Sequence, residues 1–219
     1  MPPRAHLHSF ENETKALDGD PEHSAYYQPL DGTWKFRLFP KPAVLEAEVI
    51  SQSLNDSSWE SIEVPGNWTM QGHDRPHYTN VQMPFPDQPP NIPEENPTGV
   101  YRTHFHLPES WDQRRVLIHF GGVESAFFVS CNGKGVGFAK DSRTAVEFDL
   151  TPMLQKGMNQ ISVVVIRWSD GSHLEDQDHW WMAGIHRSVY LRSTEKVYLE
   201  DVFAKTGLNK EMTEGHLEI

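Results

Sequence analysis

The stretch NQISVVVIRW, residues Asn159–Trp168, contains four consecutive branched apolar residues, Val163–Ile166. Branched side chains pack well on the pleated surface of a sheet and favour strands. Successive side chains of a strand point to opposite faces, so an unbroken apolar run is covered on both faces. The stretch therefore predicts a strand at the centre of a sheet, buried on both sides.

Shorter strand patterns lie on either side of this segment. In TWKFRLF, residues 33–39, the apolar Trp34 and Phe36 alternate with Lys35 and Arg37, which is typical of a strand with one buried face. Further strands are predicted at Ile62–Val64, Val100–Leu107, Arg115–Gly122, Ala145–Leu154 and Arg187–Ser193. Helical periodicity is weak throughout, apart from one turn near residues 150–154.

The dipeptide Asn132-Gly133 separates two apolar segments within AFFVSCNGKGVGFAKD, residues 126–141. Asn-Gly adopts the left-handed backbone of a type I′ turn at low cost, so this segment predicts a β-hairpin. Cys131 lies at the end of its first strand, where we expect a small core residue. Many short strands joined by Gly, Asn and Pro turns predict an all-β, jelly-roll-like β-sandwich.

The composition excludes several classes of protein. The chain of 219 residues carries a net charge of −12, which argues against a nucleic-acid partner. No apolar run approaches the roughly 20 residues that cross a bilayer, so we expect no membrane partner. A single cysteine forms no disulfide within the chain. The opening MPPRAHLHSFENETK lacks the apolar segment of a secretory signal, and a cytoplasmic location is expected.

The segment from residue 65 to residue 97 has frequent prolines and no apolar periodicity. A long stretch without regular structure inside a compact domain is usually functional or disordered. This one contains Trp68, Tyr78, Phe85 and Ile92, which can anchor it to a core. We therefore expect an ordered loop that packs on the body of the domain.

The two ends of the chain differ from its middle. Residues 1–27 are polar and predict an irregular, loosely held arm. Residues 197–206 predict a strand, residues 207–214 a polar turn, and the last residues the start of a second strand. An unpaired edge strand is a liability, so we expect a longer parent chain that continues this hairpin.

The stretch SDGSHLEDQDHWWMAGIHR, residues 169–187, concentrates acidic side chains beside tryptophans. Glu175 and Asp178 could form the carboxylate pair of a glycosidase, although such pairs usually come from separate strand ends. A metal site for a hard cation such as sodium, magnesium or calcium is a second interpretation. Its candidate ligands are His173, Asp176, Asp178 and His179. A solvated acidic loop is the third.

Five segments, in this order, resemble the N-terminal sugar-binding domain of glycoside hydrolase family 2, with the strongest likeness to large bacterial β-galactosidases. The resemblance spans roughly residues 28–206. Its motifs are LDGTWKF (30–36), VPGNWTMQGHDRPHYTNVQMPF (64–85), ENPTGVYR (95–102), FGGVESAFFVSCNGKGVGFAKDSRTAVEFDLT (120–151) and RWSDGSHLEDQDHWWMAGIHRSVYL (167–191).

The resemblance implies a domain order and a division of labour. Residues 28–195 would form a jelly-roll domain of the galactose-binding-domain-like type. Residues 196–219 would be the truncated first strands of an immunoglobulin-like domain, followed in the parent enzyme by a TIM barrel. The catalytic glutamates of the family lie in that barrel, so this fragment is expected to contain no catalytic residue and to be inactive alone. The full-length enzyme would be a homo-oligomer that hydrolyses terminal β-D-galactosides.

The resemblance also implies roles for individual residues. Asn80 of the YTNV motif and Asp178 of the EDQD motif would bind the sugar. Asp178 would in addition be a ligand to sodium, whose other ligands come from the missing barrel, and magnesium is expected only in that missing part. Lys140 replaces a glutamine of a peripheral magnesium site, so that site is not expected here. Glu175 and Asp176 would support the loop.

Two alternatives stay open. A free-standing carbohydrate-binding module would use exposed tryptophan and tyrosine side chains as a stacking platform, and would bind sugar without any further domain. Another specificity within the same family, such as that of a glucuronidase or a mannosidase, is the second alternative. The joint presence of the YTNV and EDQD motifs argues against this second alternative.

Overall fold

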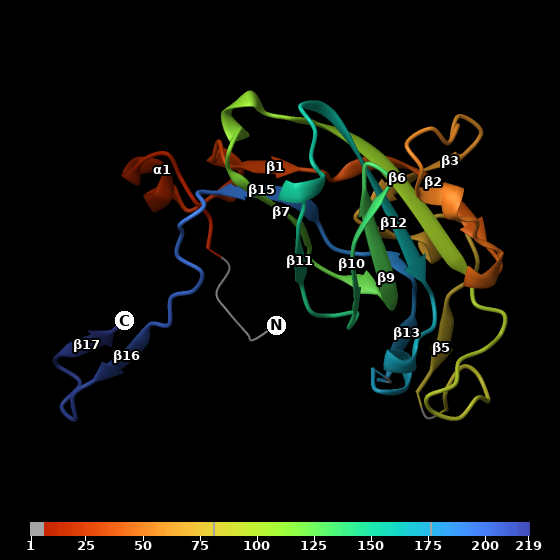
Figure 1. Cartoon of the computed structure of the whole chain (residues 1–219). Helices are drawn as coiled ribbons and strands as arrows, with labels where there is room; N and C mark the ends of the chain where they lie inside the picture. The colour runs from red at the N-terminus through yellow and green to blue at the C-terminus, as the bar shows by residue number, and fades with distance from the viewer. Residues whose placement is uncertain (1–6, 81, 176) are drawn as a thin grey trace.

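A computed structural model describes residues 7–80, 82–175 and 177–219 as two antiparallel sheets packed face to face (Figure 1). The six-stranded sheet has the order β10 (Lys134–Lys140), β9 (Ala126–Cys131), β12 (Gly157–Ile166), β6 (Thr98–Leu107), β2 (Gly32–Phe39) and β3 (Glu60–Val64). The four-stranded sheet has the order β1 (Tyr27–Pro29), β15 (Val189–Thr194), β7 (Arg115–Phe120) and β11 (Val146–Asp149). The predicted all-β sandwich is confirmed.

Strand β12 lies inside the six-stranded sheet, where it pairs with β6 along its whole length and with β9 over its second half. Ile161, Val163 and Val165 are fully buried in the core between the sheets. Val164 points to the opposite face and joins a second apolar cluster there. The prediction of a central strand buried on both faces is confirmed.

Aromatic side chains fill much of the core between the sheets. Trp34 and Phe36 of β2 pack near Tyr101 of β6, with ring centroids of Phe36 and Tyr101 4.8 Å apart. From the opposite sheet, Phe120 approaches Phe127 with a centroid distance of 5.1 Å. These rings supply large apolar areas to the interface between the sheets, which is the main stabilising term of a sandwich.

The hairpin between β9 and β10 forms as predicted. Asn132 and Gly133 have φ angles of 52° and 75°, the left-handed values that a type I′ turn requires at both central residues. The Asn132 side chain also accepts a hydrogen bond from the backbone N–H of Gln160 at 2.9 Å, which ties the turn to β12. Cys131 is a free, fully buried core residue, as expected.

The segment that follows β2 covers the outer face of the six-stranded sheet. It contains two short helical turns, η2 (Pro42–Val44) and η3 (Ala47–Ile50). Val49 and Trp59 pack there against Val164 and Val100. This cover explains why β12 needs apolar side chains on both of its faces.

The described residues of the proline-rich segment 65–97 form an ordered loop, as predicted, because Trp68 and Phe85 are buried. Its regular elements are β4 (Gly66–Asn67), η4 (Trp68–Met70) and β5 (His77–Thr79). The first pairs with β14 (Gly184–Ile185), which also pairs with β8 (Val123–Glu124), and the last pairs with β13 (His179–Trp181). The sequence analysis missed these strands because two or three residues are too few to show periodicity.

The N-terminal arm contains more structure than predicted. Helix α1 (Glu13–Asp18) is capped by the Asn12 side chain and ends at Gly19, whose φ is 76°. The expectation of an irregular arm was wrong here because local caps stabilise a short helix without an apolar face. The remaining helical turns are η1 (Pro21–His23), η5 (Glu109–Trp111), η6 (Thr151–Met153) and η7 (Asp170–His173). Among the described helices, none combines the length and the apolar content that crossing a bilayer needs.

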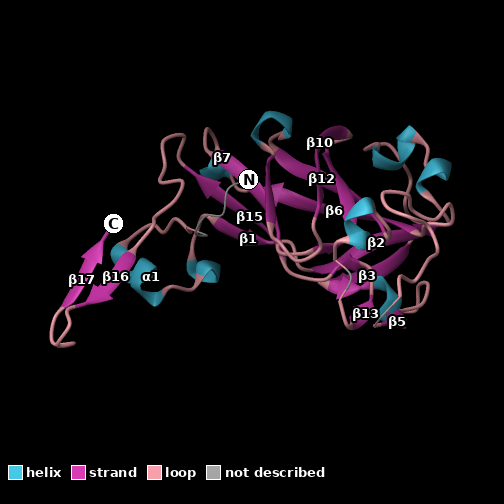
Figure 2. Ribbon diagram, turned by 90° about the horizontal axis from the view of Figure 1, so that it is seen from below, coloured by secondary structure: helices cyan, strands magenta, loops and turns pink. Residues whose placement is uncertain are grey.

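The C-terminal segment leaves the sandwich and ends in a separate hairpin of β16 (Lys205–Leu208) and β17 (Gly215–Glu218) (Figure 2). The predicted hairpin is present, but its first strand is shorter than the predicted 197–206: residues 197–204 form no ladder, and the strand begins at Lys205. Val197, Leu199 and Phe203 are mostly exposed, so the apolar alternation that suggested a strand has no core to pack on.

Shortening a buried side chain of β12 tests how much this strand contributes to the stability of the domain. We expect Ile161→Ala to lower the free energy of unfolding by about 2–5 kcal/mol, because it leaves a cavity in a fully buried site. Urea denaturation of the chain measures this. Met158→Ala is the matched control on the same strand, since Met158 is 55% exposed, and should change the value by less than about 0.5 kcal/mol. Equal losses would contradict the assignment.

Candidate functional site

The antiparallel ribbon of β5 and β13 brings the two predicted sugar-binding residues together. Its register pairs Tyr78 with Trp180 and Thr79 with His179. Asn80 follows Thr79 and Asp178 precedes His179, so both lie just beyond the same end of the ribbon, each in a bend of the chain. Asp178 lies on the side of Tyr78 and Trp180, because the Tyr78 hydroxyl donates to its carboxylate and the two rings are 5.5 Å apart. All four of them are exposed to solvent.

We call the exposed residues Tyr78, Asn80, Asp178 and Trp180 the ribbon face. A hydrogen bond orients the Asp178 carboxylate within this face. The Tyr78 hydroxyl donates to Asp178 Oδ1 at 2.7 Å, and this bond raises the pKa of Tyr78. The ring of Tyr78 lies 5.5 Å from that of Trp180. An ionised carboxylate offers about four acceptor positions, so Asp178 can accept further hydrogen bonds while it holds Tyr78.

The opposite side of the ribbon rests on a small apolar cluster. Trp181 is buried there with Trp168 and Phe85, and the rings of Trp168 and Trp181 lie 5.4 Å apart. The indole N–H of Trp181 donates to the Thr79 hydroxyl at 2.9 Å, which links the two strands through their side chains. The ribbon is therefore anchored on one side and exposed on the other.

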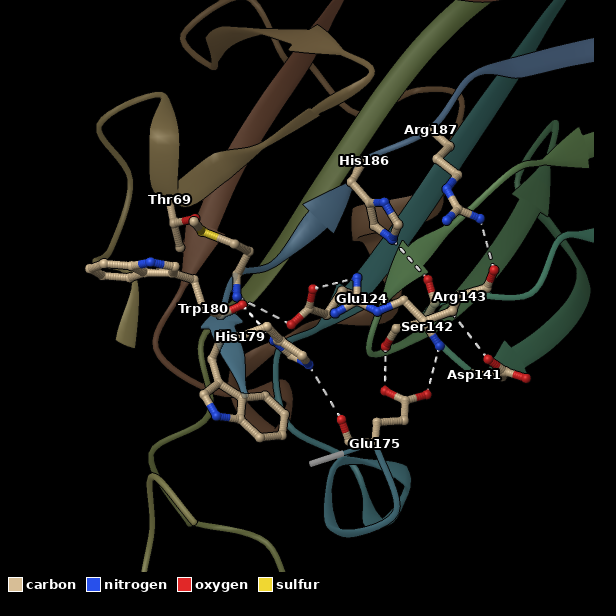
Figure 3. A network of polar contacts seen from close by, with 12 residues as sticks. Thr69, Glu124, Asp141, Ser142, Arg143, Glu175, His179, Trp180, His186 and Arg187 are labelled. Carbon is tan, nitrogen blue, oxygen red and sulfur yellow. Dashed lines mark hydrogen bonds and ion pairs between the residues drawn. The ribbon is translucent and has the colours of Figure 1, made fainter. Parts of the chain in front are cut away.

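Polar contacts hold the loop that leads into β13 (Figure 3). Both Glu175 oxygens accept from Ser142, one from its backbone N–H at 2.7 Å and one from its hydroxyl at 2.5 Å. Glu175 thus supports the loop, as expected, although its partner is a serine and not an arginine. The Glu175 carboxylate is thus bound to Ser142 while that of Asp178 is bound to Tyr78, so the two acids make separate contacts. Asp176 lies outside the described residues.

Lys140 and Asp170 form an ion pair at the beginning of the same loop. Lys140 Nζ donates to both oxygens of Asp170 at 2.6 Å, and this contact lowers the pKa of Asp170. The Asp170 carboxylate therefore has a cationic side chain as its partner.

The candidate metal ligands in the acidic stretch do not assemble around one point among the described residues. His173 Nε2 contacts the backbone oxygen of Asn91 at 2.8 Å. His179 Nδ1 contacts the backbone oxygen of Trp180 at 2.9 Å. In the part of the chain that the structure describes, no group of three or more His, Cys, Asp or Glu residues could hold a metal ion.

Glu124 is a functional candidate that the sequence analysis missed. Its carboxylate is 3% exposed, accepts a hydrogen bond from the backbone N–H of Met182 at 3.2 Å, and lies 3.4 Å from the Arg143 guanidinium. Burial raises the pKa of Glu124 to about 7. The residue borders a hollow of about 370 Å³ lined by Asn67, Glu124, Arg143, His179, Trp180 and Met182. A single glutamate between Val123 and Ser125 carries no sequence signal for such a position.

The raised pKa of Glu124 makes stability depend on pH. Between its ordinary value of 4.5 and about 7, the folded protein binds more protons than the unfolded chain, so stability falls as pH rises through this window. We expect Glu124→Gln to remove this loss. From pH 5 to pH 8, the stability of the variant relative to the wild type should rise by on the order of 1–3 kcal/mol in chemical denaturation. Parallel pH curves for the two proteins would refute the prediction.

Comparison with known proteins identifies the family. Residues 27–195 match the sequence model of glycosyl hydrolases family 2, sugar binding domain. A β-galactosidase of Psychromonas ingrahamii is 46% identical over 215 residues, which cover 98% of this chain and 21% of that protein. A β-galactosidase of Vibrio cholerae is 48% identical over 208 residues, which cover 94% of this chain and 20% of that protein. The chain thus spans about a fifth of the length of these relatives.

Solved structures show the same architecture. A β-glycosidase from Bacteroides vulgatus superposes with a TM-score of 0.56 at 29% identity, over 77% of this chain and 20% of that one. A β-glucuronidase from an uncultured Clostridium reaches a TM-score of 0.62 at 21% identity, over 84% of this chain and 31% of that one, a likeness that shows the fold alone. From the family match over residues 27–195 and these relatives, the chain belongs to glycosyl hydrolases family 2 as its sugar binding domain.

Proposed function

We propose that this chain is the N-terminal sugar-binding part of a β-galactosidase, and that it supplies Asn80 and Asp178 to an active site whose catalytic groups lie on the rest of the polypeptide. The observation that carries the proposal is the pairing of β5 with β13, which puts Asn80 and Asp178 at the same end of one ribbon, where both are exposed. The β-galactosidases that cover nearly the whole chain at 43–48% identity support the choice of enzyme.

The chemistry of the ribbon face suits a polyol. An asparagine amide both donates and accepts hydrogen bonds, so Asn80 can bind a sugar hydroxyl in either sense. The Asp178 carboxylate accepts strong hydrogen bonds from hydroxyl groups, and Tyr78 restricts its rotation. Such contacts orient the sugar for groups elsewhere in the enzyme, and a rigid orientation contributes to catalysis by removing entropic cost from the reaction.

Asp178 would also be a ligand to sodium. A carboxylate oxygen suits a hard monovalent cation, and the exposed position of Asp178 leaves room for ligands from another part of the parent enzyme. The ion would reduce the negative charge on Asp178 and fix its geometry beside the sugar. Magnesium would be held only by the catalytic part, since Asp170 is paired with Lys140 in this domain.

The two catalytic carboxylates are assigned to the missing part of the parent enzyme. Retaining hydrolysis of a glycoside needs a nucleophile and an acid/base whose carboxyl groups lie about 5–5.5 Å apart. Glu175 is bound through both oxygens to Ser142, and Asp178 is bound to Tyr78. These contacts suit support and binding, so we assign neither residue to proton transfer. We further propose that the full-length enzyme is a homo-oligomer in the cytoplasm.

A free-standing carbohydrate-binding module is the second candidate, and one observation favours it. Tyr78 and Trp180 are about half exposed and lie side by side on the ribbon face, where they could stack on a sugar ring. Such a module would bind galactosides without the rest of the enzyme. The β-galactosidases that match nearly the whole chain at 43–48% identity favour the first candidate.

We expect that the 219-residue chain alone does not hydrolyse an aryl β-galactoside, whereas the full-length parent enzyme does. The reason is that the proposal assigns both catalytic carboxylates to the rest of the enzyme. Release of the aryl group at equal molar concentrations measures both. Isothermal titration of the chain with galactose in the same buffer separates the two candidates, since a free-standing module binds the sugar. Hydrolysis by the chain alone would refute the proposal.

The role of Asp178 predicts a loss on conversion to the amide. We expect Asp178→Asn in the full-length enzyme to lower kcat/KM by about 10²-fold or more and to abolish the response to sodium, because the variant loses a charged ligand and a strong acceptor. Steady-state kinetics with and without sodium measures both effects. Asp112→Asn is the matched control, since Asp112 is exposed near η5 and away from the ribbon. Unchanged kinetics for Asp178→Asn would remove the assigned role.

A further inference from the structure

The Arg167 guanidinium is a buried charge directly beneath the ribbon. Its side chain is 1% exposed and makes an ion pair with Asp74. It also donates to the backbone oxygen of Arg75 at 2.9 Å, to His77 Nδ1 at 2.9 Å and to the backbone oxygen of Trp181 at 3.5 Å. Since a guanidinium only donates, the His77 nitrogen is the acceptor in this contact.

Arg167 is itself held by the central sheet. It directly follows β12, and its backbone N–H donates to the Pro97 oxygen at 3.0 Å. The next residue, Trp168, exchanges two hydrogen bonds with the buried Asn96 side chain, at 2.9 and 2.8 Å. The guanidinium lies 4.8 Å from the centre of a Trp168 ring. The guanidinium of Arg167 therefore extends from a segment whose backbone is hydrogen-bonded to residues 96 and 97.

The partners of Arg167 belong to both strands of the ribbon. His77 and Trp181 form the innermost pair of the β5–β13 ladder. Each lies three residues along its strand from Asn80 or Asp178, which is about 10 Å at the usual rise of a strand. Arg167 therefore lies too far along the strands to touch a sugar bound between Asn80 and Asp178, but it contacts both strands that present these residues.

We propose that Arg167 is a positioning residue for the sugar site: it fixes the beginning of β5 and the end of β13 to the central sheet and so positions Asn80 and Asp178 at the other end of the ribbon. This inference rests on the proposed function of those two residues. It explains why a charge lies under an exposed loop. A short ribbon of two strands is marginally stable alone, and buried hydrogen bonds to a rigid sheet hold it in one register.

Lysine cannot replace arginine in this role. The planar guanidinium holds its N–H donors in fixed directions: Nη1 donates to Asp74, and Nη2 lies within hydrogen-bond distance of acceptors on residues 75, 77 and 181. An ammonium group keeps the positive charge but cannot reach all of these acceptors. Arg167→Lys therefore preserves the ion pair with Asp74 while it weakens the hold on the ribbon, which separates positioning from charge.

The fold provides a matched control in Arg102. Its side chain is also 1% exposed and pairs with an acid, Asp56, at 2.9 Å. It donates to the backbone oxygens of Val49 at 2.9 Å and Ser51 at 3.0 Å. These partners belong to the segment that covers the outer face of the sheet. Arg102→Lys thus disturbs a comparable buried network that does not contact the ribbon.

Hydrogen exchange on the 219-residue chain tests the positioning directly. In Arg167→Lys, we expect the backbone amides of residues 77–80 and 178–182 to exchange about 10-fold faster or more, with thermal unfolding monitored to confirm that the variant is folded. In Arg102→Lys, faster exchange should instead appear at residues 49–56. Unchanged exchange in the ribbon of Arg167→Lys, or equal acceleration there in both variants, would overturn the proposal.

Kinetics of the full-length enzyme tests the consequence for binding. We expect Arg167→Lys to raise two values by about 10-fold: KM for an aryl β-galactoside and the sodium concentration for half activation. The change in kcat should be smaller. Residues that orient ligand-binding groups typically affect affinity by this amount. Arg102→Lys should leave both values unchanged at a temperature where the three proteins are equally folded.

The two failures can be told apart. If Asp178→Asn leaves kinetics unchanged, the proposed function is wrong, whatever Arg167→Lys does to hydrogen exchange. If Asp178→Asn impairs the enzyme while Arg167→Lys affects neither KM nor the sodium response, the function stands and the positioning role of Arg167 is wrong.

Discussion

The burial of β12 on both faces is the constraint on which the rest of the structure depends. One face closes the core between the sheets, and the other packs under the segment after β2. A strand in this position is held in register, because a shift of one residue would replace Ile161, Val163 and Val165 in the core by a face that contains Gln160 and Ser162. Its C-terminal end is therefore a fixed point from which Arg167 and Trp168 extend toward the ribbon.

The ribbon that carries the candidate site has little stability of its own. β5 and β13 contain three residues each, and the face that presents Asn80 and Asp178 is exposed. Its position comes from contacts on the other face: the apolar cluster around Trp181, the Thr79 hydrogen bond and the Arg167 network. A rigid sheet that supports a short exposed ribbon is a common way to hold polar groups for recognition.

The sequence predicted the sandwich well because its strands are long enough to show a period. Clear patterns were the apolar run at residues 159–168 and the alternation of apolar and polar side chains at residues 33–39. The dipeptide Asn132-Gly133 identified the turn between β9 and β10. The failures have a shared cause. β4, β5 and β13 are too short for periodicity, α1 depends on caps at Asn12 and Gly19, and the alternation after residue 196 has no core to pack on.

For the site, the sequence by itself determined which residues are candidates, since Asn80 and Asp178 belong to segments that resemble the motifs of one family. Only the tertiary structure decided that they lie at the same end of one ribbon, that Tyr78 holds Asp178, and that Arg167 contacts the other end of that ribbon. The physical reason is that pairing between strands about a hundred residues apart depends on register and on buried polar contacts. Neither is encoded in the local pattern of either segment.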